Sequence, residues 1–507
     1  MKTPLLGIVM AVAAAAQTYP VAGVVTDGVH NAPVERARVI LSDESGGRHA
    51  LTTGADGRFA FTVPEGKYTL YAERMGWRIV YGSSGPWAGF GSAVIAGPGK
   101  DTAHLALRWY PPGAIYGKVV DEQDEPVRDA TVQLMRDGVF GGRRRILEAD
   151  YATTDDRGEY RVAPLAAGTY YTLVTAKPWY AMADSSPDTG AIYPATYYPG
   201  ATDIREAAPV TLKSGAEVEA DVPLRATTGV HVHVRCPGSG RENDGCPGDP
   251  VLTLHSFAGI GAYLEPDPDA VPPGRYTLLV KGGDKTARRI VDVGSGDLTV
   301  DLTLKPDPLI TGKVSFKSGP PKPGATLYVG LVDETSGNEV DAPVEPGGAF
   351  RFANTGGSRF RPYLYGSAKM FIAKLSAQGA PFKDGLVDLT EETVAHLDIL
   401  ASDETGRLKG YAMNGDKPAP AVMVVLVPRA TAADPAEPLG NQTESDGSFD
   451  YESVPAGDYL LFAVDKLDFE YANPEVTRPY LAAATAVHIP AHGVAEQRVP
   501  VAAGAGK

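Results

Sequence analysis

The sequence predicts an all-β protein, built as a tandem array of about five Greek-key β-sandwich modules that follow a signal peptide. Three observations predict this class: a hairpin pattern recurs along the chain, turn-forming residues are abundant, and helical periodicity is scarce. The 58 glycines and 42 prolines make up about a fifth of the 507 residues, which exceeds average usage and suits many short strands joined by turns. A chain of this length is expected to form several cores.

Residues 1–16 are interpreted as an export signal. Lys2 supplies one positive charge, residues 5–12 are apolar, and the alanines at 14–16 precede Gln17 as a small-residue cleavage site. The apolar run is too short to span a bilayer, and no later run approaches that length. We therefore expect export to the periplasm or the outside of the cell, without a membrane span.

The hairpin that defines a module is clearest at residues 53–70. Asp56 and Gly57 predict a tight reversal, because glycine tolerates positive φ and aspartate hydrogen-bonds to nearby backbone. Phe59 and Phe61 alternate along the next strand, so both rings face one side. The pattern returns at 156–170 and 446–459. We interpret it as an antiparallel β unit that is used several times.

Module boundaries are predicted from the recurrence of the elements around this hairpin. In the first module, strands are expected at 21–25, 38–41, 49–53 and 102–108, with an insertion at 75–99. The second module repeats this order, opens at 115–121, closes at 218–224 and carries an insertion at 177–207. The predicted modules are 17–110, 111–227, 228–306, 307–402 and 403–503. Their size of roughly 95–100 residues suits a Greek-key sandwich.

Short motifs give these modules a family resemblance. In the first module they are Gly23-Val24-Val25, Pro33-Val34-Glu35-Arg36-Ala37, Asp56-Gly57-Arg58-Phe59 and Pro64-Glu65-Gly66-Lys67-Tyr68. With their counterparts in the second and fifth modules, they resemble the carboxypeptidase regulatory-like domain family. The resemblance implies a transthyretin-like, carbohydrate-binding-like β-sandwich in a tandem-module secreted bacterial protein. Members serve as accessory, adhesive or binding modules, so the resemblance implies no peptidase activity and transfers no catalytic residues.

Charge and motifs argue against several function classes. The net charge of −15 disfavours nucleic acid and anionic membranes, because both require a basic surface. None of the nine histidines stands in a His-Glu-x-x-His motif, and the chain has no Gly-x-Ser-x-Gly elbow, P-loop or dinucleotide fingerprint. We therefore expect a protein that is not an enzyme and needs no metal or other cofactor.

The cysteines Cys236 and Cys246 flank a loop rich in Gly, Asp and Asn. His231 and His233 precede them and face one side of a predicted strand. Two cysteines in an exported chain favour a disulfide, whose closure of this loop is worth roughly 3 kcal/mol in the chain-entropy model. A His/Cys metal site and free thiols are the alternatives.

The two insertions are rich in aromatic residues. Sugars stack their C–H faces on aromatic rings, so exposed rings on sandwich loops would suit saccharide binding. The alternative is that these rings cap the sandwiches or pack between modules. The candidate ligand-binding aromatics are Trp77, Tyr81, Trp87, Phe90, Trp179, Tyr180, Tyr193, Tyr197 and Tyr198. A further loop, 138–145, contains three arginines and is expected to be solvated, with contact to an anion as the alternative.

The sequence therefore predicts an exported, non-catalytic binding or scaffolding array. One alternative is polysaccharide binding through the aromatic insertions. Another is an accessory subunit of a separately encoded enzyme or outer-membrane uptake system. The expected partner classes are a polysaccharide and a cell-envelope protein.

Overall fold

The computed structural model describes residues 17–83, 91–181, 191–239, 245–254, 270–283, 285–307, 309–334, 339–353, 358–383, 385–390, 394–429 and 437–502. Almost all regular structure in these ranges is β-strand, which confirms the all-β fold class. The described strands form consecutive groups and pair only within their own group. The number of autonomous modules and their boundaries remain a prediction.

The N-terminal group, β1–β8, is a sandwich of sheet β4-β1-β8 and sheet β3-β2-β5-β6, to which β7 is added beside β5. Its core includes Val21, Leu41, Leu70 and Leu107. Its strands are β1 (Thr18–Asp27), β2 (Arg38–Asp43), β3 (Arg48–Thr52), β4 (Arg58–Pro64), β5 (Gly66–Arg74), β6 (Trp77–Val80), β7 (Val94–Ala96) and β8 (Leu105–Trp109).

The next group, β9–β19, contains sheet β11-β10-β13-β15 with β16, sheet β12-β9-β17 with β18, and the pair β14-β19. Its elements are β9 (Gly113–Val120), β10 (Thr131–Phe140), β11 (Arg143–Thr153), β12 (Glu159–Leu165), β13 (Gly168–Thr175), η1 (Trp179–Ala181), β14 (Ala191–Ile192), β15 (Thr196–Tyr197), η2 (Ile204–Glu206), β16 (Val210–Leu212), β17 (Glu217–Glu219), β18 (Val222–Pro223) and β19 (Thr227–Thr228). Ala166 of this group packs into the core of the N-terminal group, and Ala195 packs into the core of the following group. Adjacent groups are therefore in apolar contact.

Two further groups follow. The β20–β25 group pairs β20-β24 and β21-β22-β23-β25. Its strands are β20 (Val232–Arg235), β21 (Pro250–Leu254), β22 (Gly274–Gly282), β23 (Lys285–Val293), β24 (Leu298–Asp301) and β25 (Lys305–Pro306). The β26–β34 group stacks sheet β29-β26-β34-β31 on sheet β28-β27-β30-β33-β32. Its strands are β26 (Leu309–Phe316), β27 (Tyr328–Asp333), β28 (Glu339–Pro343), β29 (Ala349–Ala353), β30 (Arg359–Tyr365), β31 (Phe371–Gln378), β32 (Phe382–Lys383), β33 (Leu386–Asp388) and β34 (Val394–Ser402).

The C-terminal group, β35–β42, contains the one α-helix among the described residues. Its elements are β35 (Thr405–Asn414), β36 (Lys417–Pro418), β37 (Met423–Pro428), β38 (Leu439–Gln442), β39 (Ser448–Pro455), β40 (Gly457–Val464), α1 (Pro474–Leu481), β41 (Thr485–Ile489) and β42 (Val494–Ala502). Asn473 caps α1 by accepting a hydrogen bond from the Glu475 amide. Tyr480 of the helix stacks on Phe462 of β40, with 5.2 Å between ring centroids.

In every group the opening strand pairs in parallel with a strand from the C-terminal part of the same group. This pairing joins β1 with β8, β9 with β17 and β18, β20 with β24, β26 with β34, and β35 with β42. The prediction of an antiparallel unit was therefore incomplete, because the groups combine antiparallel hairpins with parallel pairing of the opening strand, and the C-terminal group also pairs β40 with β42 in parallel.

The repeated Gly-x-Val motif has a steric explanation. Its glycine lies opposite an aromatic residue of the following hairpin, in the pairs Gly23–Phe59, Gly117–Tyr160 and Gly312–Phe350, and Gly410 of the related sequence Gly410-Tyr411-Ala412 lies opposite Phe449 in the same way. A Cβ atom at Gly410 would lie 1.8 Å from the Gln497 carbonyl oxygen and 2.9 Å from the Phe449 ring. Glycine therefore lets the closing strand and the aromatic ring approach the opening strand closely.

The Gly-x-Tyr part of the hairpin is a second recurring device. The tyrosine hydroxyl donates to the carbonyl oxygen four residues earlier, in the pairs Tyr68–Pro64, Tyr170–Ala166, Tyr276–Pro272 and Tyr459–Pro455. The bond recurs even in the β20–β25 group, where the sequence pattern is weak. The recurring tyrosine of the hairpin is thus explained by folding.

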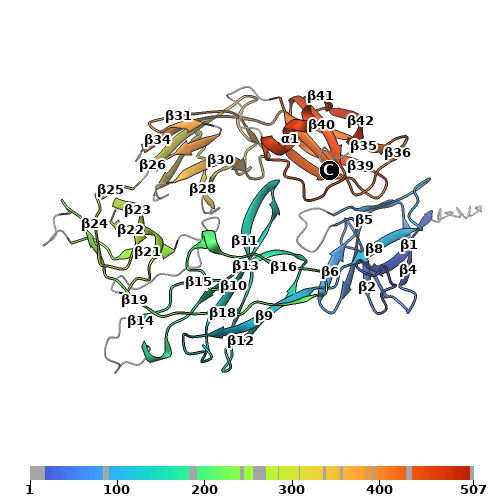
Figure 1. The fold of residues 1–507 in the computed structure, drawn as a ribbon. Coiled ribbons are helices and arrows are strands. Elements are labelled where there is room, and N and C mark those ends of the chain that lie inside the picture. Colours follow the sequence, from blue (N-terminus) through green and yellow to red (C-terminus); the bar gives the residue numbers. More distant parts are fainter. Residues whose placement is uncertain are drawn as a thin grey trace, which may run out of the picture.

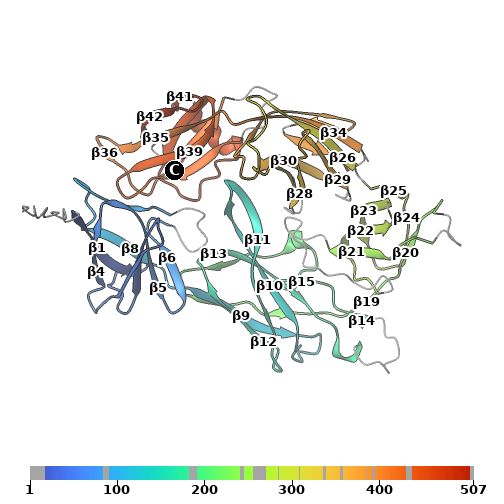
Figure 2. The same ribbon diagram turned by 180° about the vertical axis from the view of Figure 1, so that it is seen from behind.

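The chain follows a closed path in space (Figures 1 and 2). The C-terminal group, coloured red, lies beside the blue N-terminal group in both views. Hydrogen bonds between residues about 350 positions apart join the two. The ends of the array are therefore in contact, an arrangement that the sequence did not predict.

Candidate functional site

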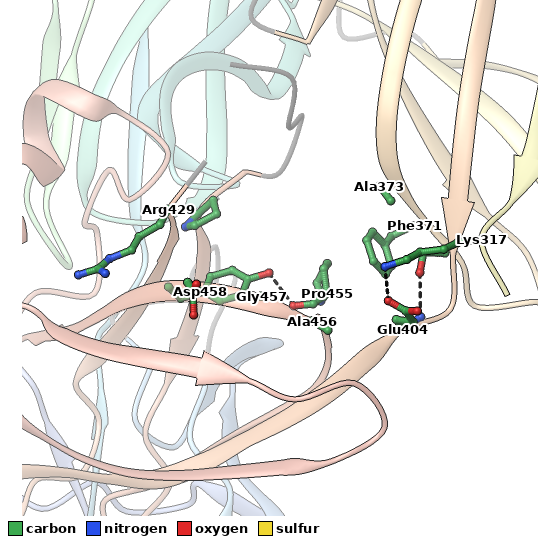
Figure 3. Close-up of a pocket in the computed structure, with 12 residues that line it drawn as sticks. Lys317, Phe371, Ala373, Glu404, Arg429, Pro455, Ala456, Gly457 and Asp458 are labelled. Carbon is green, nitrogen blue, oxygen red and sulfur yellow. Dashed lines mark hydrogen bonds and ion pairs between the residues drawn. The ribbon is translucent and has the colours of Figure 1, made fainter. Parts of the chain in front are cut away.

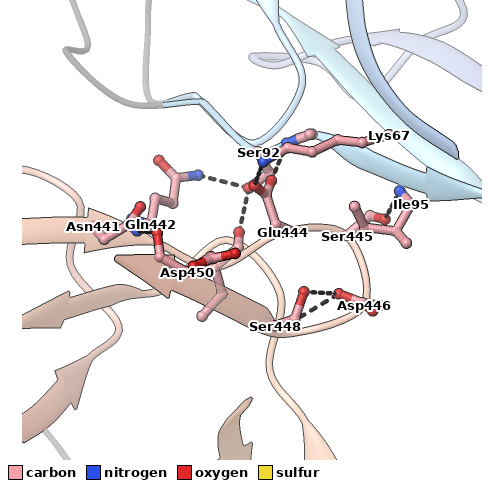
Figure 4. Close-up of polar contacts among 12 residues, drawn as sticks. Lys67, Ser92, Ile95, Asn441, Gln442, Glu444, Ser445, Asp446, Ser448 and Asp450 are labelled. Atoms are coloured by element: carbon pink, nitrogen blue, oxygen red, sulfur yellow. Dashed lines mark hydrogen bonds and ion pairs between the residues drawn. The ribbon is translucent and has the colours of Figure 1, made fainter. Parts of the chain in front are cut away.

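The contact between the terminal groups is formed by the Asp-Gly turn of the last hairpin. Glu444 accepts a hydrogen bond from the Ala93 amide and pairs with Lys67 at 2.7 Å between Oε1 and Nζ. The Ser445 amide donates to the Ala93 carbonyl, and the Ile95 amide donates to Ser445 Oγ at 3.0 Å. Figure 4 shows these side chains converging on the edge of the N-terminal group. The turn therefore binds the backbone of β7 and of the residues before it through one backbone hydrogen bond and two side-chain acceptors.

Two further sets of polar contacts flank this turn. Lys100 Nζ donates to Asp446 Oδ2 at 2.5 Å. Gln442 Nε2 donates to the Gly82 carbonyl at 2.6 Å and to Ser92 Oγ at 2.9 Å. We call residues 67, 82, 92–95 and 100 together with 442–446 the closure interface. The interface combines two ion pairs, Lys67–Glu444 and Lys100–Asp446, with neutral hydrogen bonds from Gln442 and to Ser445.

Contacts in the closure interface shift the pKa of the Asp446 carboxyl. Burial alone would raise the pKa of the Asp446 carboxyl, but hydrogen bonds from Lys100 and Ser448 outweigh this effect and lower that pKa below its ordinary value. The hydrogen bond to Asp446 in turn raises the pKa of Lys100. Each partner therefore favours the charged form of the other.

Acid is expected to weaken the closure interface. Because the pKa of Asp446 is lowered in the closed form, its stabilising contribution is present above the ordinary aspartate value of about 4 and is lost as the pH falls through the lowered value. Small-angle X-ray scattering from pH 7 to pH 3 should show an increase in radius of gyration while far-UV circular dichroism stays constant. Asp446→Asn should reduce this pH dependence. An unchanged radius over that range would contradict the interpretation.

The arginine-rich loop also contributes to the closed arrangement. It forms the tip of the β10–β11 hairpin, where Arg143 pairs with Glu437 of the C-terminal group at 2.9 Å. The Ala472 amide donates to the Gly142 carbonyl at 3.0 Å, and a Cβ atom at Gly142 would lie 2.5 Å from the ring of Tyr471. The expectation of a solvated loop was therefore wrong for Arg143, because the hairpin reaches another group.

A cavity of about 250 Å³ lies between the β26–β34 and C-terminal groups. Lys317 and Glu404 pair at 2.6 Å on one side of it, and Arg429 lies on the other side (Figure 3). Phe371 and Asp458 complete a lining of mixed charge. A charge-paired crevice of this kind can accommodate a small polar group, and its lining contains no cysteine and no serine–histidine pair that could act as an activated nucleophile.

The predicted ligand-binding aromatics occupy different environments. Trp77 on β6 is buried, with 7% of its surface exposed. Tyr193, between β14 and β15, and Tyr197 on β15 are also buried, with exposures of 6% and 2%. Tyr81 and Tyr198 are partly buried and pack against the cores. These residues pack in or against the cores of the sandwiches, and β6, β7, β14 and β15 lie in the predicted insertions and add to sheets. Trp87 and Phe90 lie outside the described residues.

Trp179 and Tyr180 differ from the other candidates. Trp179 is 67% exposed and meets the ring of Tyr180 edge-on, with 5.6 Å between centroids. The Tyr180 hydroxyl donates to Glu122 Oε1 at 3.2 Å and also bonds to Tyr193. An exposed indole beside a carboxylate is an arrangement that can stack on a sugar and accept hydrogen bonds from its hydroxyls.

Cys236 and Cys246 form a disulfide with an S–S distance of 1.99 Å. His231 and His233 lie on one face, as predicted, with stacked rings 5.8 Å apart. His231 Nδ1 lies 3.5 Å from Asp297 Oδ1. Within the described ranges, no three His, Cys, Asp or Glu side chains are placed to hold a metal ion. The disulfide is therefore the interpretation that the structure supports.

Removing this disulfide is expected to destabilise the β20–β25 group. The bridge closes a short loop beside its core, and Cys236 is fully buried, so Cys236→Ser with Cys246→Ser should cost about 3 kcal/mol. Hydrogen exchange measured by mass spectrometry should accelerate in residues 232–301 and remain unchanged in the N-terminal group. An intact mass showing two free thiols in the unreduced wild-type protein would contradict the bridge.

No helix in the described part of the chain combines the length and the apolar character needed to cross a bilayer.

Sequence reasoning missed several residues that the structure brings together. Asp446 was expected only as a turn residue, and Glu444 and the tyrosines of β27 and β30 were not considered. The alternation of Tyr363 and Tyr365 indicates that both side chains lie on one face of a strand. No local pattern indicates that this strand, β30, pairs with β27.

A protein-family model matches part of the chain. The model of the carboxypeptidase regulatory-like domain matches residues 20–83 and 114–225. The match covers the N-terminal group up to β6 and most of the β9–β19 group, but not residues 403–503, where the sequence resemblance was also expected. No curated protein matches the chain.

Solved structures give only distant overlaps. The Bacillus anthracis TIE protein is 9% identical, with 96% of this chain and 68% of that chain covered and a TM-score of 0.17. The minor pilin GBS52 of Streptococcus agalactiae is 14% identical over 41% of this chain and 95% of its own, with a TM-score of 0.22. The shaft pilin SpaA of Lactobacillus rhamnosus GG is 12% identical over 41% and 98%, with a TM-score of 0.18. These TM-scores are too low to relate the functions of those proteins to this chain. The family match, in contrast, shows that the chain carries the carboxypeptidase regulatory-like domain in two segments.

Proposed function

We propose that the chain is an exported, non-catalytic scaffold that binds a cell-envelope polymer or protein through loops held in fixed relative positions. The observation that carries this proposal is the closure interface, in which Glu444, Ser445 and Asp446 attach the C-terminal group to the N-terminal group. A flexible string of sandwiches would leave its loops free to move relative to one another. A closed array presents them in one geometry.

The other contacts between groups support the same role. Arg143 on the β10–β11 hairpin and Arg361 on β30 both approach Glu437, at 2.9 Å and 3.3 Å. Three groups therefore meet at one carboxylate. Holding binding surfaces in place before a partner arrives lowers the entropic cost of binding at several points.

The proposal is tested in the cell that makes the protein. The mature chain should be recovered outside the cytoplasm and should begin at Gln17. Chemical cross-linking in intact cells should join it to a defined envelope component, and Glu444→Lys should reduce that cross-link. Retention in the cytoplasm, or a reaction by the purified chain that one substitution abolishes, would overturn the proposal.

Saccharide binding at Trp179 is a second candidate function, favoured by the exposure of this indole beside Tyr180 and Glu122. Titration with soluble polysaccharides should then quench tryptophan fluorescence. Trp179→Phe should keep most of the affinity in a direct binding assay, and Trp179→Ala should lose it. A flat titration across a broad panel would remove this candidate.

A further inference from the structure

The outer face of sheet β28-β27-β30 contains three adjacent tyrosine rings. Tyr328 on β27 and Tyr365 on β30 are direct cross-strand partners. Their rings stack with 5.1 Å between centroids and an interplanar angle of 18°. Tyr363 stacks on Tyr365 at 5.7 Å and 28°. The rings form a continuous row, which we call the tyrosine platform, and Tyr365 remains 39% exposed.

Gly330 makes this face flat. It is the cross-strand partner of Tyr363, and a Cβ atom at Gly330 would lie 2.2 Å from the Tyr363 ring. The ring can therefore lie directly over the strand. Glycine in a strand interior is otherwise unfavourable, so its placement here permits a surface on which another planar face can rest.

Carboxylates border the platform on β28. The Tyr363 hydroxyl donates to Glu339 Oε2 at 2.9 Å, and the Tyr365 hydroxyl is hydrogen-bonded to Asp341. Burial, together with Glu339, raises the pKa of Tyr363 to about 12, so this hydroxyl stays protonated. Each carboxylate accepts several hydrogen bonds and thus has capacity for further donors.

We propose that the tyrosine platform binds a neutral pyranose saccharide chain. One sugar ring would stack its C–H face on the exposed part of the row at Tyr365, which Tyr328 supports by stacking against it, and sugar hydroxyls would donate to Glu339 and Asp341. The carboxylates and the net charge of −15 disfavour an acidic polymer. This inference rests on the proposed binding role and names a ligand class and a place for it.

The test is isothermal titration of the full-length mature protein with cellohexaose, maltohexaose and chitohexaose. At least one should bind, and Tyr365→Ala and Tyr328→Ala should each weaken its affinity about tenfold. Tyr365→Phe, which keeps the ring, should retain affinity to within about threefold. Tyr151→Ala is the matched control, because Tyr151 on β11 is 63% exposed and not part of the platform.

Each outcome of the titration supports or overturns the inference. Binding that Trp179→Ala abolishes and Tyr365→Ala does not would overturn the inference and support the second candidate function instead. Binding of decaproline without any hexasaccharide would assign the face to a peptide and overturn the inference. Failure of all three hexasaccharides to bind would also overturn the inference. The proposed scaffold role would still be decided separately, by export of the protein and by the effect of Glu444→Lys on cross-linking. Unchanged melting temperatures of the variants would show that lost affinity is not lost folding.

Discussion

Glu444→Lys is expected to separate the terminal groups while each group stays folded. The wild-type carboxylate is 16% exposed, pairs with Lys67 at 2.7 Å and accepts the Ala93 amide. Removing one partner of a largely buried charge pair costs about 2–5 kcal/mol, and because Lys67 is half exposed we expect about 3 kcal/mol. The introduced ammonium would also lie beside Lys67 and repel it. Small-angle X-ray scattering should show a larger radius of gyration with unchanged circular dichroism.

Glu496→Lys is the matched control for this variant. Glu496 pairs with Lys409 at 3.0 Å within the C-terminal group and is 71% exposed. The same charge change at an exposed pair should cost little and leave the scattering profile as in the wild type. Equal expansion of both variants would show that net charge, rather than the closure interface, governs the shape.

Gly410→Ala is expected to destabilise the C-terminal group by about 3 kcal/mol or more. The added Cβ would lie 1.8 Å from the backbone oxygen of Gln497, which cannot move without breaking the parallel pairing of β35 with β42. It would also press on the Phe449 ring, which packs in the core. Hydrogen exchange should accelerate throughout residues 405–502.

Gly294→Ala provides the comparison, since nothing lies within 4 Å of its built Cβ. It should change stability by less than about 0.5 kcal/mol and leave exchange in β23 and β24 unchanged. Protection in β35, β39 and β42 that is the same in Gly410→Ala and the wild type would show that the close approach of the backbone at Gly410 is not required.

The local hairpins could be predicted because their signals are local. Asp56 and Gly57 fix the turn, and the alternation after Phe59 fixes the strand, so β4 and β5 agree with expectation. The parallel pairing of β1 with β8 could not be predicted, because it joins segments about 80 residues apart without a motif that links them. Trp77 carries a local signal of its own. Its alternation with Ile79 indicated a strand, and the structure buries both.

The candidate sites were harder to predict than the fold. Asp446 has the same sequence context as other Asp-Gly turns, and only its neighbours from the N-terminal group distinguish it. Tyr328 and Tyr365 become neighbours through the register of β27 and β30. Contacts of this kind depend on how strands and groups pack, which alternation and turn chemistry do not specify.

The closed array is tested most directly by zero-length carbodiimide cross-linking of the dilute monomeric protein, followed by peptide mass spectrometry. Carbodiimide joins only amines and carboxylates already in contact. We predict the linked pairs Lys67–Glu444 and Lys100–Asp446, whose atoms lie 2.7 Å and 2.5 Å apart, and their loss in Glu444→Lys. Formation of the control link Lys409–Glu496 without either of these two would contradict closure.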